Sequence, residues 1–179
     1  MKKPIGVLAA LALLSFSLLS TGCSNTKPPA YSDLNNQKQP FKVQIRSTKS
    51  PLKLGELLQL QIRSMSEGFI NLYTVSSSGK VASLLENRPI KGGQNLYFPS
   101  ARSVADYRIG PPLGTETYIV LVSRKKLNWI APSDRLNHNL GLTTLNLNKN
   151  QLIRRLQQSV TLFPKDDWNM STLSLQIVD

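Results

Sequence analysis

The side chains that most often perform chemistry in proteins are few in this chain of 179 residues, and they lie far apart. His138 is the one histidine, and it stands in the polar stretch Leu-Asn-His-Asn-Leu-Gly. The ten Asp and Glu residues are mostly isolated, and the pair Asp166-Asp167 resembles a turn before the last predicted strand. The Lys-Gly-Gly-Gln-Asn stretch at 91–95 lacks the strand-to-helix context of a phosphate-binding loop. We therefore expect no catalytic site, no metal and no cofactor.

The single cysteine, Cys23, directly follows the most hydrophobic segment of the chain. That segment begins after Lys2 and Lys3 and runs from Ile5 to Leu19. A positively charged start followed by a short apolar run is typical of a secretory signal. The run is also shorter than the ~20 apolar residues that cross a bilayer. The alternatives are an ordinary signal peptide with an incidental cysteine and an uncleaved anchor helix.

The small residues Ser-Thr-Gly before the cysteine resemble the lipobox of bacterial lipoproteins, with Ser20 at the position where Leu is usual. In that family diacylglycerol is attached to the cysteine and cleavage follows immediately before it. The resemblance implies that residues 1–22 are a lipoprotein signal peptide and that Cys23 carries the lipid. Buried acyl chains contribute ~0.8 kcal/mol per methylene to membrane attachment. Ser24 follows the cysteine in place of Asp, which by analogy with enterobacterial sorting favours the outer membrane, facing the periplasm.

Residues 24–40 are rich in Pro, Asn, Ser and Gln and contain few side chains to bury. This composition is typical of a flexible linker. We therefore predict three segments: a signal peptide over 1–22, a lipidated flexible tether over 23–40, and a β-rich globular domain over 41–179. No cysteine remains in that domain for a disulfide, so packing alone must stabilise it.

Short segments with a period of two follow and predict strands. Residues 68–75 are apolar on both faces, as in a central strand, and the Ser-rich turn at 76–80 predicts a hairpin with the next segment. Thr115–Ser123 has the strongest β-propensity. The predicted strands with the clearest patterns are 41–46, 58–63, 68–75, 81–85, 115–123 and 173–178.

One segment has the period of a helix. After the N-cap region around Asn148, the side chains of Leu152, Ile153, Leu156 and Val160 fall on one helical face. We therefore expect a mainly β fold: an antiparallel β-sandwich-like domain with one main α-helix near the C-terminus, packed over an edge or end.

The chain is strongly basic, with 22 Lys and Arg against 10 Asp and Glu, a formal charge of +12. A secretory signal argues against nucleic acid as the partner, whereas an anionic membrane surface or an acidic protein face suits this charge. The alternative is that the high charge only keeps a tethered domain soluble. The candidate interaction patch consists of Arg124, Lys125, Lys126, Arg154 and Arg155, and further cations near the first strand are Lys42, Arg46, Lys49 and Lys53.

A longer motif runs through the first two thirds of the domain. It has a Leu-x-x-Gly-Glu opening, a Gly-aromatic-aliphatic-x-Leu-Tyr strand, a Gly-Lys-Val turn and a Pro-Pro-x-Gly-x-Glu turn. The matching residues are Gly55, Glu56, Gly68, Leu72, Tyr73, Gly79, Leu84, Asn87, Pro111, Pro112, Gly114 and Glu116, and Glu86 stands where Pro is usual.

This pattern resembles the domain of unknown function 4384 over roughly residues 41–127. The resemblance implies a β-rich accessory module of bacterial envelope proteins, without an enzymatic activity or a binding site. Glu56 and Asn87 are the matched polar residues that merit a test, and hydrogen bonding at a turn or strand end accounts for each.

Our leading hypothesis is a non-enzymatic, lipid-anchored envelope module that binds a protein partner and supports a secretion or surface-assembly apparatus. The alternative is a periplasmic binding module for an anionic glycan or lipid headgroup through basic loops. A hydrolase using a serine and His138 is the weakest hypothesis.

Overall fold

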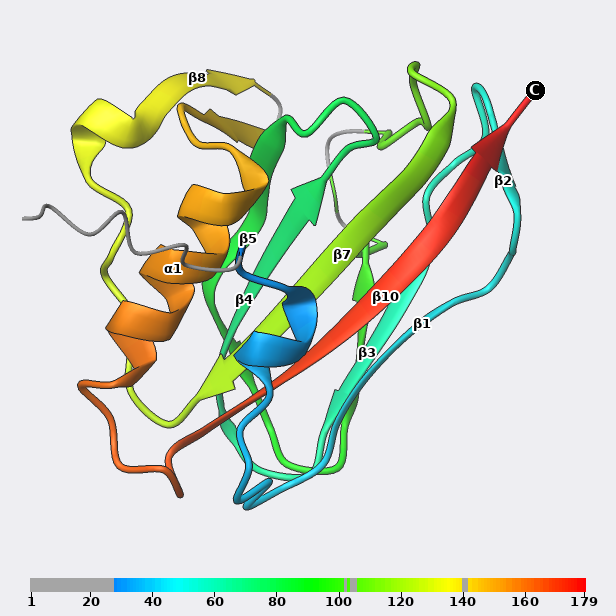
Figure 1. The fold of residues 1–179 in the computed structure, drawn as a ribbon. Coiled ribbons are helices and arrows are strands. Elements are labelled where there is room, and N and C mark those ends of the chain that lie inside the picture. The colour runs from blue at the N-terminus through cyan, green and yellow to red at the C-terminus, as the bar shows by residue number, and fades with distance from the viewer. Residues whose placement is uncertain (1–27, 102, 104–105, 140–141) are drawn as a thin grey trace, which may run out of the picture.

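The computed structural model describes residues 28–101, 103, 106–139 and 142–179, so the predicted signal peptide and Cys23 lie outside the described residues. These residues form strands, one α-helix and two short 3-10 helices (Figure 1). In chain order the elements are η1 (Tyr31–Leu34), β1 (Val43–Ser47), β2 (Leu52–Lys53), β3 (Leu60–Ser64), β4 (Gly68–Val75), β5 (Val81–Ile90), β6 (Asn95–Phe98), β7 (Gly114–Ser123), η2 (Pro132–Asp134), β8 (Arg135–Asn139), β9 (Leu142–Leu145), α1 (Lys149–Val160) and β10 (Trp168–Val178). Within the described part of the chain, no helix is long and apolar enough to cross a membrane.

The strands form two sheets. The smaller has the order β1-β3-β6, and the larger has the order β2-β10-β7-β4-β5-β9-β8. A mainly β fold with one helix near the C-terminus is thus confirmed. The predicted antiparallel pairing holds for the pairs of strands in both sheets except one, because β2 runs parallel to β10. That pairing brings the chain after β1 beside the last strand.

The larger sheet is the middle layer of the domain, with the smaller sheet on one face and α1 on the other (Figure 1). Strand β7 shows how the sequence produces this: Tyr118 and Val120 belong to the core under the smaller sheet, whereas Ile119 and Leu121 belong to the core under α1. Because alternate side chains of a strand point to opposite faces, a strand that is apolar at every position can serve two cores. The expectation that the helix covers an edge or end is corrected, since α1 covers a face.

The helix itself matches its predicted pattern. The side chain of Asn148 accepts a hydrogen bond from the backbone N–H of Gln151 at 3.0 Å, and the Gln151 side chain accepts one from the N–H of Asn148 at 2.8 Å. This reciprocal cap satisfies two backbone donors that a helix start otherwise leaves unpaired. Four apolar side chains of one face are buried, namely Leu152, Ile153, Leu156 and Val160.

The segment before β1 packs onto the domain. Leu34 is 1 % exposed and belongs to the core under α1. The side chain of Asn36 is also buried and donates to the carbonyl oxygens of Lys165 and Trp168, each at 2.7 Å. The prediction of a flexible tether over 23–40 is therefore corrected for residues 31–36. The composition of residues 24–40 does not reveal this packing, because only two side chains, Leu34 and Asn36, hold the segment against the domain.

Candidate functional site

The five predicted basic residues lie at two places. Arg124, Lys125 and Lys126 are exposed directly after β7, whereas Arg154 and Arg155 lie on α1. Arg124 borders a depression with Gly68 and Phe69, and Arg155 borders another. Each of these two depressions is lined by a residue of only one of the two groups.

Three of these five cations have partners within the domain. Arg124 lies 3.8 Å from the carboxylate of Asp167. The Lys126 ammonium lies 5.7 Å from the centre of the Phe69 ring, within the range of a cation–π contact. Arg155 forms an ion pair with Asp134, which is buried. These contacts hold the segment after β7 and the helix α1 in place, and they reduce the charge available to a ligand.

The residues first considered for catalysis lie in different parts of the chain, in β8 and in the segment between α1 and β10. His138 lies in β8, with its backbone opposite Thr143. Asp166 pairs with Lys38 at 3.0 Å, and Asp167 with Arg124. Among the described residues, no three His, Cys, Asp or Glu side chains are placed to hold a metal ion together.

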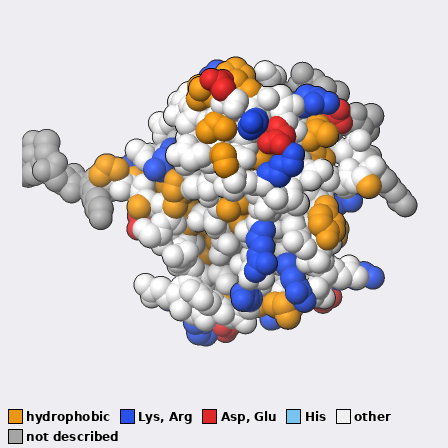
Figure 2. Space-filling model, turned by 90° about the vertical axis from the view of Figure 1, so that its right-hand side faces the viewer, with side chains coloured by type: hydrophobic (Ala, Val, Ile, Leu, Met, Phe, Trp, Pro, Cys, Tyr) orange, Lys and Arg blue, Asp and Glu red, His pale blue; other side chains and the backbone are white. Residues whose placement is uncertain are grey.

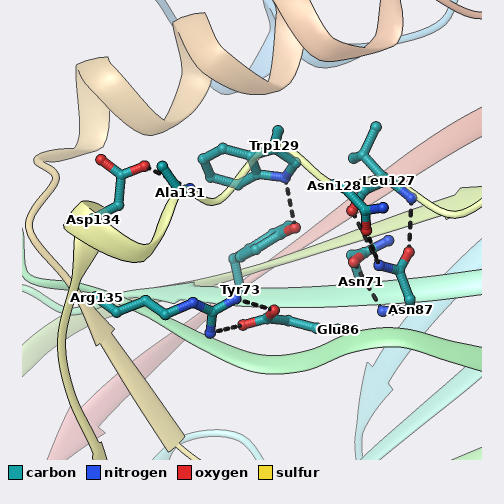
Figure 3. A network of polar contacts seen from close by, with 10 residues as sticks. All are labelled: Asn71, Tyr73, Glu86, Asn87, Leu127, Asn128, Trp129, Ala131, Asp134 and Arg135. Carbon is teal, nitrogen blue, oxygen red and sulfur yellow. Dashed lines mark hydrogen bonds and ion pairs between the residues drawn. The ribbon is translucent and has the colours of Figure 1, made fainter.

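A polar network at the middle of β4 and β5 contains Asn87, one of the two matched polar residues that merit a test (Figure 3). The register between these strands shifts so that Glu86 and Asn87 stand opposite Asn71, a β-bulge. Asn87 has a backbone φ of +49°, a conformation that Asn adopts more readily than most residues. Its N–H donates to the Asn71 side chain at 3.0 Å.

The Asn87 side chain then holds the segment after β7. Its Nδ2 donates to the carbonyl oxygen of Leu127 at 3.1 Å and to the Asn128 side chain at 3.2 Å, and its Oδ1 accepts from the N–H of Leu127 at 2.8 Å. Leu127 lies beyond the end of β7, where no strand in the described part of the chain pairs with its backbone. The amide side chain of Asn87 satisfies both its N–H and its carbonyl oxygen instead. These hydrogen bonds give Asn87 a structural role, because its side chain joins the β5 bulge to the segment after β7.

An aromatic pair continues the network toward β8. The indole N–H of Trp129 donates to the hydroxyl of Tyr73 at 2.9 Å, and the ring centroids are 5.5 Å apart. Tyr73 is fully buried, which raises the pKa of its phenol far above its ordinary value. Nearby, Arg135 donates to both carboxylate oxygens of Glu86, at 2.9 and 2.6 Å, and this pairing raises the pKa of the guanidinium. The network fixes the 127–135 segment over the sheet (Figure 3).

Glu56, the other matched polar residue that merits a test, closes the turn after β2. Its side chain binds the Lys49 ammonium and accepts from the N–H of Lys53 at 3.0 Å. The hydrogen bond from Lys49, followed by that from Lys53, lowers the pKa of the Glu56 carboxyl. Glu56 therefore has a structural role as well, because its side chain stabilises this turn.

Sequence reasoning missed the solvent face of the smaller sheet. A depression of 140 Å³ lies there, lined entirely by polar side chains of three neighbouring strands, namely Gln44, Arg46, Gln61, Arg63 and Asn95. Figure 2 looks at the side of the molecule where β1 and β2 lie, and it shows a group of Lys and Arg side chains gathered there. The signal for this face was present in the sequence, because Gln-Ile-Arg-Ser occurs at both 44–47 and 61–64.

Comparison with protein families gives one match: residues 51–126 match the model of the domain of unknown function DUF4384. The resemblance drawn from the motif is thereby confirmed for this stretch. It spans β2 to the end of β7, including the bulge at Asn87. Comparison with curated proteins and with solved structures gave no match.

Proposed function

We propose that this chain, which carries a DUF4384 match over residues 51–126, is a non-enzymatic, lipid-anchored module of the bacterial cell envelope. It binds another envelope protein as part of a secretion or surface-assembly apparatus. The observation that carries the proposal is the position of Cys23, the only cysteine, directly after a short apolar run with a basic start.

The packing of η1 supports a membrane-proximal position for the domain. Only residues 24–30 separate Cys23 from the first packed residue, Tyr31. A fully extended chain of this length spans at most about 28 Å. A lipid on Cys23 would therefore hold the domain close to the bilayer surface, where it would meet partners of the same membrane.

The contacts of the described polar network support the non-enzymatic part of the proposal, because its titratable side chains are engaged within the domain. The carboxylates of Glu86 and Asp134 are paired with arginines, and the Tyr73 hydroxyl accepts a hydrogen bond from Trp129. Each of these groups holds a loop in place. The predicted basic patch is the weaker candidate for a glycan or headgroup site, because Arg124 and Lys126 after β7 and Arg155 on α1 have internal partners.

The test combines processing, fractionation and capture. Globomycin, which blocks lipoprotein processing, should leave an unprocessed precursor, and Cys23→Ala should release the chain from the membrane fraction. Ser24→Ala is the matched control and should change neither. Crosslinking in the intact envelope should then join the wild-type chain to one discrete protein. Unchanged processing and fractionation in the first two experiments would contradict the anchor, and the absence of a crosslinked partner would contradict the interaction role.

A further inference from the structure

Strands β1 and β3 carry the same four residues in a symmetric pairing. Gln-Ile-Arg-Ser occupies 44–47 and 61–64, and the antiparallel register sets Gln44 opposite Arg63 and Arg46 opposite Gln61, with Ile45 opposite Ile62 at the centre. The two copies are therefore related by a local twofold axis between the isoleucines.

The alternation of the strands separates the two kinds of side chain. Ile45 and Ile62 are 7 % and 0 % exposed and belong to the core between the sheets. The Gln and Arg side chains point to the solvent face, because successive residues of a strand face opposite sides. The symmetry continues at each strand end, where the hydroxyls of Ser47 and Ser64 each accept from a backbone N–H two residues later, at 3.2 Å.

Four side chains thus form a quartet with arginines on one diagonal and glutamines on the other. Diagonal neighbours in an antiparallel pair are roughly 7–8 Å apart, within reach of long side chains. Strand β6 extends the face, with Asn95 opposite Arg63 and Tyr97 opposite Gln61. The depression of 140 Å³ lies over this quartet.

Among the residues that the structure describes, no carboxylate pairs with the two guanidinium groups. Strands β1, β3 and β6 contain no Asp or Glu. Within the described part of the chain, the side chains of Arg46 and Arg63 take part in no ion pair, whereas Arg135, Arg155 and Lys49 each have a carboxylate partner. Like charges at this separation repel, so a bound anion would stabilise the face.

We propose that this face is a binding site for a phosphate group carried by a ligand. A guanidinium presents its N–H groups as a fork that matches two oxygens of a phosphate, and two arginines match the charge of about −1.5 to −2 that a phosphomonoester carries at pH 7. The Gln and Asn amides donate to remaining phosphate oxygens or to neighbouring hydroxyls.

The size of the depression limits which part of a ligand it can hold. At 140 Å³ it is smaller than the roughly 300–1,000 Å³ of pockets that enclose a drug-sized ligand. It therefore accepts the phosphate, while the rest of the ligand lies along the exposed sheet or in solvent. The inference does not rest on lipidation of Cys23, because the face belongs to the domain itself.

The experiment titrates the full chain, purified in a nonionic detergent, with inorganic phosphate, glycerol 3-phosphate and short-chain dihexanoyl phosphatidic acid. Binding is followed by calorimetry and by the arginine Nε–H signals in NMR spectra. We expect saturable binding that shifts the Arg46 and Arg63 signals. Arg46→Gln and Arg63→Gln should each raise the dissociation constant at least tenfold, and the double variant should bind no phosphate. Gln is already present on both strands, so these variants preserve the sheet.

Arg154→Gln is the matched control, since it removes one exposed positive charge at a distant helix and should change the dissociation constant less than twofold. Tighter binding of dihexanoyl phosphatidic acid than of glycerol 3-phosphate would assign the phosphate to a lipid headgroup, and equal binding would assign it to a soluble ester. The proposal is overturned by the absence of saturable phosphate binding, by equal weakening in Arg154→Gln, or by equally tight binding of acetate. Crosslinking of an acidic protein at Arg46 without phosphate binding would also overturn it.

Discussion

The side chain of Asn87 exchanges two hydrogen bonds with the backbone of Leu127, donating to its carbonyl oxygen at 3.1 Å and accepting from its N–H at 2.8 Å. The two residues are forty positions apart, so one amide joins the β5 bulge to the segment after β7. These two hydrogen bonds explain why Asn stands at position 87, where β5 bulges out of its regular pairing with β4.

Replacing Asn87 with Ala should therefore be costly. The variant loses two hydrogen bonds to a buried residue, at about 1 kcal/mol each, and places Ala in a left-handed conformation at about 1 kcal/mol more. We expect the free energy of unfolding in urea to fall by about 2–3 kcal/mol.

Asn128→Ala is the control, because it removes only the exposed hydrogen bond that Asn87 donates to the Asn128 side chain. We expect it to lower the free energy of unfolding by less than about 1 kcal/mol. Equal losses for the two variants would contradict the role given to Asn87.

The packing of η1 gives a second prediction. Leu34 is 1 % exposed in the core under α1, so Leu34→Ala should lower the free energy of unfolding by about 2–4 kcal/mol. The neighbouring Asn35 is exposed, and Asn35→Ala should change it by less than about 0.5 kcal/mol. If urea titrations showed no difference between the two variants, the segment would be a flexible tether in solution.

A third prediction concerns the stability of the domain as the pH falls. The hydrogen bond from Arg155 is the main cause that holds the pKa of the Asp134 carboxyl below its usual value. A carboxyl with a lowered folded-state pKa contributes stability above its unfolded pKa and loses it as the pH falls through the folded value. Wild type should therefore be more stable than Asp134→Asn at pH 7, and the difference should shrink below about pH 4. A difference in urea midpoint that stayed constant from pH 7 to pH 3 would contradict this assignment.

The arginine face of the smaller sheet yields a prediction on stability that needs no ligand. Arg46 and Arg63 share a diagonal without an anion, so Arg46→Gln should raise the free energy of unfolding by a few tenths of a kcal/mol at low salt. Because salt screens exposed charges, the gain should vanish near 1 M NaCl. Arg154→Gln should give no such salt-dependent gain in thermal unfolding, and a gain as large as that of Arg46→Gln would argue against local repulsion.

Much of the fold was predictable because local pattern and burial agree. The segment 68–75 is apolar on both faces and is β4, between β5 and β7. The cap at Asn148 and the apolar stripe after it define α1. Thr115–Ser123 differs from β7 by one residue at its start. These elements could be predicted from the sequence because the residues of each one carry its periodicity or its cap.

The rest depended on contacts between distant segments. Strand β5 continues to Ile90 through a bulge that needs Asn71 and Leu127 as partners. Strand β10 begins at Trp168 because it pairs with every residue of β7. The parallel pair of β2 and β10 joins residues from opposite ends of the domain. Such pairings leave no local periodicity.

The same distinction applies to the candidate site. The basic residues 124–126 and 154–155 stand out as charge runs, yet three of them are held by internal partners. The face with Arg46 and Arg63 shows single charges in the sequence, and only the register of β1 with β3 brings them together. A duplicated four-residue segment is the sequence signal that could have found it.

Mass spectrometry of the N-terminal peptide of the mature protein, isolated from bacterial membranes, tests the central claim most directly. Lipid anchoring predicts a peptide that begins at Cys23 and carries the mass of a diacylglycerol thioether, with a further acyl group on the amine. An N-terminal peptide that begins elsewhere, or one that begins at Cys23 with a free thiol, would contradict the proposal of a lipid-anchored envelope module.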